Sequence, residues 1–179
     1  MSTIKFTPII GGIGSLEAHC YLLDIDDCRI LLDCGWDSKF NTQQYDKLEQ
    51  FAKTIDIILI SHSDMLHMGA LVYVVKRFSL DVPILCTTPL YHMGQKLLYD
   101  AYESKRNEED FQLYNLDDVD FVSKLFIELK FSQKYDFDSK DVEFSPQSAG
   151  HTLGGSIWRI TKGTEEIIYA VDFNHKPER

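Results

Sequence analysis

The sequence lacks any long apolar run, and this absence excludes a membrane-spanning protein. A transmembrane helix needs about 20 consecutive apolar residues, and no stretch of that kind occurs in the 179 residues. The first 14 residues contain one lysine and an apolar stretch interrupted by Pro8 and glycines, so we expect that they do not act as a secretory signal peptide. We expect no membrane partner.

Cysteine is scarce, and the four cysteines show no CxxC pair. A zinc ribbon requires CxxC-type pairs, and a disulfide framework shows a regular cysteine spacing, which this chain lacks. Buried free thiols in a reducing compartment, the nucleus or the cytoplasm, fit this pattern better. The four residues are Cys20, Cys28, Cys34 and Cys86.

Basic residues are also in short supply. Lys and Arg number 18 against 28 Asp and Glu, which gives a net charge of −10, and acidic residues gather between positions 100 and 120. Sequence-independent affinity for RNA depends on Lys and Arg that neutralise phosphates. The charge therefore disfavours an RNA-binding module that acts alone. We expect any contact with RNA to require other subunits of a complex.

Short apolar runs closed by polar residues predict strands, and apolar positions at helical spacing between them predict helices. The predicted helices lie at 41–53, after Gly69, from Pro89, and from an Asn115 cap through Leu129. The predicted strands are 21–25, 29–33, 56–60 and 83–86, followed by KFSQKYDF, VEFSP, SIWRIT and EIIYAV, with Lys162 and Gly163 in the last turn. The pattern indicates one α/β domain with a β-rich second part and no linker or repeat.

A group of polar residues follows three of the predicted strands. His62, Asp64 and His67 occupy the loop SHSDMLHMGAL, His151 lies in the glycine-flanked loop SAGHTLGGSIW, and Asp172 ends the run IIYAV. Each alone is more simply a hydrogen-bonded structural residue. Together they form a metal-site pattern, because ligands gather in the loops at the carboxyl ends of strands in α/β folds.

This pattern resembles the metallo-β-lactamase family, and within it the β-CASP branch that processes pre-mRNA 3′ ends. Active members read His-x-His-x-Asp-His in the first loop, carry a His in an AGHxLG-like loop, and end a strand with Asp. His62, His67, His151 and Asp172 match those positions. The runs LLDCGWD, SHSDMLHMGALVY, LDDVD, LKFSQ, AGHTLGGSIWRI and YAVDFNHK extend the likeness over the entire chain.

Two positions depart from the active pattern. Asp64 stands where active members have their second His, and Leu66 stands where they have Asp. A carboxylate can still bind zinc, so Asp64 is an ambiguous loss. Leucine has no lone pair, so Leu66 removes a ligand of the second metal and a proton acceptor for the attacking water.

The resemblance implies an αββα sandwich of which residues 1–179 supply the leading part, mainly the first sheet, with the rest of the domain and the β-CASP insertion absent. Within the resembled family, the replacements at Asp64 and Leu66 are those of catalytically inactive members. The resemblance implies that such members are nuclear and pair with a homologous zinc-dependent 3′-end endonuclease. Other cleavage and polyadenylation factor subunits are further implied partners, and pre-mRNA is reached through the complex. We expect no catalytic residues, no cofactor and no stoichiometric zinc.

One alternative stays open. A rearranged single-metal site built from His62, Asp64, His151 and Asp172 would make the chain an active metal-dependent RNA endonuclease. Two other residues near these motifs are interpreted as structural. His19 precedes a strand, and Asp33 ties down its loop by hydrogen bonds to backbone amides.

Overall fold

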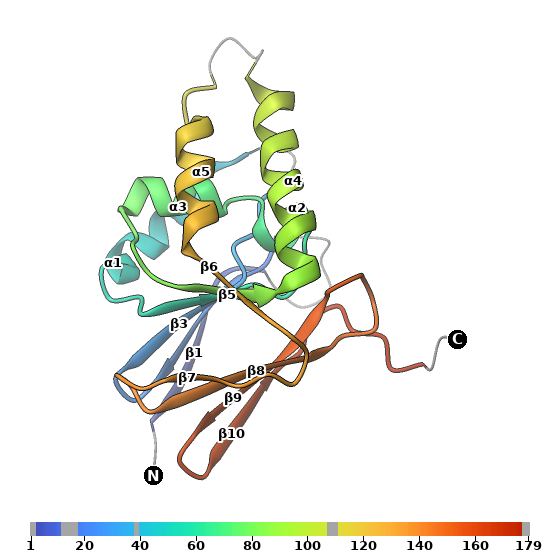
Figure 1. The fold of residues 1–179 in the computed structure, drawn as a ribbon. Helices are drawn as coiled ribbons and strands as arrows, with labels where there is room; N and C mark the ends of the chain where they lie inside the picture. The colour runs from blue at the N-terminus through green and yellow to red at the C-terminus, as the bar shows by residue number, and fades with distance from the viewer. Residues whose placement is uncertain (1–2, 12–17, 38–39, 107–110, 177–179) are drawn as a thin grey trace.

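The computed structural model describes residues 3–11, 18–37, 40–106 and 111–176. Within them two sheets pack face to face, and helices cover the outer side of the first sheet (Figure 1). These three layers, the helices, the first sheet and the second sheet, confirm the metallo-β-lactamase-like architecture predicted from the sequence.

The first sheet has six strands in sequence order. The first three strands are antiparallel and β3 to β6 are parallel. Parallel neighbours need crossovers, which the helices supply. The strands are β1 (Ile4–Ile10), β2 (Cys20–Ile25), β3 (Cys28–Leu32), β4 (Ile57–Leu59), β5 (Ile84–Thr87) and β6 (Phe126–Leu129).

The helices lie on one face of this sheet (Figure 1). Asn115 caps the last of them through a capping box with Asp118, as its position before an acidic turn predicts. They are the 3-10 helix η1 (Thr42–Leu48), α1 (Glu49–Ala52), α2 (Met65–Met68), α3 (Leu71–Phe78), α4 (Thr88–Lys105) and α5 (Leu116–Leu125). None of the helices in the described ranges is long and apolar enough to span a bilayer.

The second sheet is antiparallel, in the order β10-β9-β8-β7. Its strands are β7 (Tyr135–Phe137), β8 (Val142–Ser148), β9 (Ser156–Lys162) and β10 (Glu165–Tyr169). Alternation along each strand divides the core, because successive side chains point to opposite faces. Leu31 packs toward the helices, whereas Ile30 and Leu32 pack toward the second sheet.

Two expectations are wrong. The predicted helix after Asn115 was to continue to Leu129, but Phe126 turns extended and 126–129 form β6, paired with β5. In this segment the pairing of β6 with β5 outweighs the helical spacing of the apolar residues. The chain was also expected to supply mainly one sheet, yet it builds both, and Trp158 and Tyr169 are buried between them. Strand β1 was not predicted.

Candidate functional site

Five segments bring polar side chains to one edge of the two sheets. Asp33 follows β3, His62 follows β4, and Asp172 follows β10, while α2 carries His67. His19 lies just before β2, and because β2 and β3 are antiparallel, the start of β2 meets the end of β3. The sequence-predicted loops therefore do converge.

Asp33 forms the buried centre of this edge. Its side chain is fully buried and accepts hydrogen bonds from the Ser61 amide at 2.7 Å and from the Ser61 hydroxyl at 2.7 Å. Tyr169 donates a third at 2.6 Å. Burial raises the pKa of Asp33, and nearby His67 and these hydrogen bonds only partly offset it. Asp33 thus fixes its loop as predicted, although two of its three donors are hydroxyls.

His62 continues this network. The single hydroxyl proton of Ser61 goes to Asp33, so the Ser61 oxygen accepts from Nδ1 of His62, 2.9 Å away. That assigns the proton of the neutral imidazole to Nδ1 and leaves a lone pair on Nε2, which is buried and has no partner among the described residues. Burial, followed by the charge of His67, lowers the pKa of His62 to about 4. His62 is therefore neutral at pH 7.

Asp64 acts within its own turn. Its carboxylate caps α2 by accepting from the Leu66 amide at 2.9 Å, and it lies 2.8 Å from Nδ1 of His67. A carboxylate can only accept, so Nδ1 of His67 carries the proton. The Leu66 side chain offers no ligand atom, but the Leu66 carbonyl accepts from the backbone amide of His19 at 2.7 Å. Both replaced positions have structural roles.

His67 is 1 % exposed, and its Nε2 has no hydrogen-bond partner in the described part of the chain. Nε2 lies 3.6 Å from a carboxylate oxygen of Asp172. Burial disfavours the charged ring, but the hydrogen bond to Asp64 and the charges of Asp33, Asp64 and Asp172 outweigh it, so the pKa of His67 is raised. His67 thus lies among three carboxylates that favour its protonated form.

His151 lies apart from this group. It is exposed, and among the described residues its ring makes an edge-on contact to His62, with ring centroids 5.9 Å apart. Gly155, four residues further along the same loop, lies closer to the site, because a Cβ there would lie 2.9 Å from Nε2 of His62. A residue without a side chain lets the loop after β8 close over His62.

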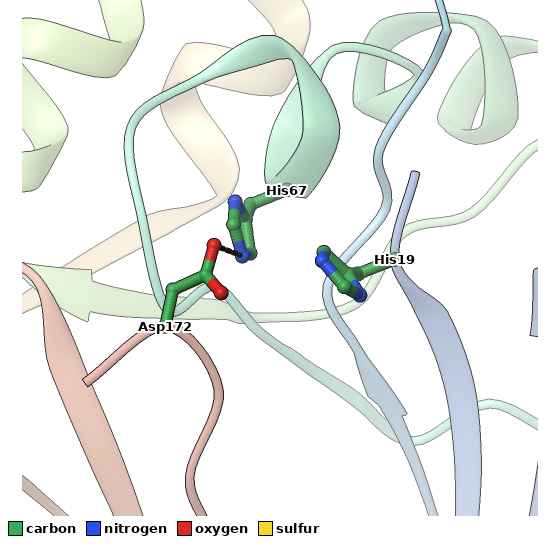
Figure 2. Close-up of side chains that lie close together, drawn as sticks. All are labelled: His19, His67 and Asp172. Carbon is green, nitrogen blue, oxygen red and sulfur yellow. Dashed lines mark ion pairs between the residues drawn. The ribbon is translucent and has the colours of Figure 1, made fainter. Parts of the chain in front are cut away.

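Two of the six family positions offer a metal less than the active pattern does. Leu66 has no donor atom, and the Asp64 carboxylate is engaged by the α2 cap and His67. Among the described residues, the metal-ligating atoms that gather within 4.8 Å of one another belong to His19, His67 and Asp172 (Figure 2). His67 and Asp172 belong to the motifs, whereas His19 was expected to be structural. The position of His19 at the start of an antiparallel hairpin is the signal that could have indicated its place near the end of β3.

The fold and the matched motifs define a class. The family model described as a metallo-beta-lactamase superfamily domain matches residues 22–179. The chain belongs to the metallo-β-lactamase superfamily. A metallo-beta-lactamase fold protein from Bacillus subtilis superposes with a TM-score of 0.56 at 18% identity, covering 94% of this chain and 61% of that one.

Named relatives indicate which members of the superfamily the chain is similar to in sequence. The chain is 45% identical over 181 residues to the probable cleavage and polyadenylation specificity factor subunit 2 of Drosophila melanogaster, covering 99% of this chain and 24% of the relative. It is 41% identical to the subunit of the same name from Oryza sativa subsp. japonica, with the same coverage of 99% and 24%. The chain thus spans about a quarter of the length of these relatives.

Proposed function

We propose that this chain serves in a non-catalytic subunit of the nuclear machinery that cleaves and polyadenylates pre-mRNA. The relatives named as cleavage and polyadenylation specificity factor subunits support the setting. The absence of a ligand atom at Leu66, where active members of the family carry Asp, is the observation that carries the non-catalytic role.

Metal-assisted hydrolysis requires a water molecule activated by the metals and a group that positions it. Leu66 supplies neither a metal ligand nor a proton acceptor. Asp64 cannot readily compensate, because its carboxylate completes the α2 cap and holds Nδ1 of His67. Releasing it for a metal would leave the Leu66 amide without its acceptor, at a cost of about 1 kcal/mol.

The function then lies in association. We infer that the direct partner is the homologous zinc-dependent 3′-end endonuclease, together with other cleavage and polyadenylation factor subunits. The net charge of −10 supports contact with pre-mRNA through the complex and not by this chain alone. The motif loops also serve the fold, since Asp33, Ser61 and Nδ1 of His62 form one hydrogen-bonded chain.

Incubation of labelled pre-mRNA with the full-length subunit and added zinc or manganese tests the non-catalytic role. We expect no cleavage above that of buffer with metal. Cleavage that disappears in His151→Ala but persists in His92→Ala, which changes an exposed histidine on α4, would contradict the proposal and establish the active endonuclease instead.

A further inference from the structure

We propose that His19, His67 and Asp172 bind one divalent transition-metal ion of the zinc class, with water in the fourth position. Their ligand atoms lie within 4.8 Å of one another, and they come from three segments distant in sequence (Figure 2). The proposal goes beyond the non-catalytic function, because one ion at this site would not replace the second metal ligand and the proton acceptor that Leu66 lacks.

His67 supplies the observation that points most directly to a ligand. Its ring is 1 % exposed, and Nε2 has no hydrogen-bond partner among the described residues. A buried polar atom without a partner costs free energy that a ligand would recover. Figure 2 shows this nitrogen directed toward Asp172, whose carboxylate oxygen is 3.6 Å away.

Asp64 orients His67 for this purpose. Its carboxylate accepts from Nδ1 of His67 at 2.8 Å, so a neutral ring has its lone pair on Nε2, the atom that faces the site. Metal-binding histidines usually donate their other ring N–H to a carboxylate in this way. The carboxylate that replaces the second His of the active pattern is thereby a positioning group and not a ligand.

His19 is oriented in the same manner. Its Nδ1 lies 2.9 Å from the Tyr21 hydroxyl, and in the tautomer in which Nδ1 donates to that oxygen the lone pair of Nε2 is available to a metal. The ring centroids of His19 and His67 are 4.7 Å apart. Two imidazoles, each held by a partner on its far nitrogen, thus approach one carboxylate.

Geometry and charge fit a single small cation. Two ligands of a tetrahedral zinc with bonds of about 2.1 Å lie about 3.4 Å apart, close to the 3.6 Å between His67 Nε2 and Asp172 Oδ2. Asp33 and Asp64 add negative charge around the two imidazoles. The Asp172 side chain is 48 % exposed, so water reaches the fourth position from that side.

This ligand set shares His67 and Asp172 with the family positions but differs from them in its third protein ligand. It omits His62, Asp64 and His151, and it depends on His19, which no family motif contains. It revises the expectation of no bound zinc, because that expectation considered only the motif positions. The ion would fasten the loop after β10 to α2 and to the start of β2.

Metal titration of the full-length protein tests the site. After removal of metal with a chelator, we expect one Zn²⁺ per chain by elemental analysis, one Co²⁺ with a visible absorption band, and a rise in melting temperature on adding Zn²⁺. His19→Gln should weaken binding by at least about 100-fold, since loss of an outer-shell partner alone costs 10- to 100-fold. His19→Leu provides a second variant of the same ligand.

His151→Ala is the matched control, because it removes an exposed histidine of the family pattern that lies outside the proposed set. Unchanged Zn²⁺ binding in this variant, with loss in both His19 variants at retained circular dichroism, supports the proposal. Binding only at millimolar metal, or binding lost in His151→Ala and kept in His19→Gln, would overturn it.

Discussion

Tyr169 donates a hydrogen bond to Asp33 over 2.6 Å, and this bond joins the last strand of the second sheet to the end of β3 in the first. Trp158 makes a parallel link, since its Nε1 donates to the carbonyl of Ile60 at 3.0 Å. The two sheets are therefore held together by directed polar bonds at the site edge as well as by apolar packing.

Removal of the Tyr169 hydroxyl should destabilise the fold. Hydrogen bonds to charged groups contribute about 1.5 to 3 kcal/mol, so we expect Tyr169→Phe to lower the free energy of unfolding by that amount. Denaturant titration measures it. Tyr114→Phe is the matched control, because the buried Tyr114 hydroxyl has no partner among the described residues and its loss should be neutral or stabilising. Equal effects would contradict the account.

Gly35 is required because the Leu66 carbonyl packs directly against it. A Cβ at Gly35 would lie 1.5 Å from that oxygen, which is held by the His19 amide. We expect Gly35→Ala to cost about 3 kcal/mol or more, since overpacking against backbone forces the loops apart. Gly163→Ala, at φ +57 with no atom within 4 Å, should cost only about 1 to 2 kcal/mol. Thermal melts of both variants compare them.

The four cysteines should be unreactive in the folded protein. All are free and buried, and burial, followed by the charge of Asp56, raises the pKa of Cys28 to about 12. Burial also raises the pKa of Cys86. The thiolate is the nucleophile, so we expect no alkylation by iodoacetamide at pH 8 without denaturant and four alkylated thiols with it, by mass spectrometry. Rapid native alkylation would refute the burial.

The sequence predicted the parts of the fold that depend on local pattern. Strands such as β3 and β5 and the Asn115 cap were found because apolar runs and capping residues act within a few positions. Strand β6 was missed because its extended form depends on pairing with β5, a contact from about 40 residues earlier in the chain. Propensity alone does not contain that information.

The sequence predicted most of the residues of the site, but not which of them lie together in the structure. The motif residues His62, His67 and Asp172 do converge, yet His151 remains exposed and His19 enters the cluster. His19 belongs to no motif, and its contribution depends on the antiparallel pairing of β2 with β3. The role of Asp64 as a partner of His67 likewise required the geometry of α2.

Cleavage of pre-mRNA by the reconstituted complex tests the non-catalytic role most directly. His62→Ala should cost about 1 to 3 kcal/mol, because it leaves the Ser61 hydroxyl without its donor, whereas the exposed His151 tolerates Ala. The account predicts that complexes carrying either variant assemble and cleave at near the wild-type rate. Normal assembly with cleavage lost in His151→Ala, and lost only in a metal-dependent manner, would contradict it.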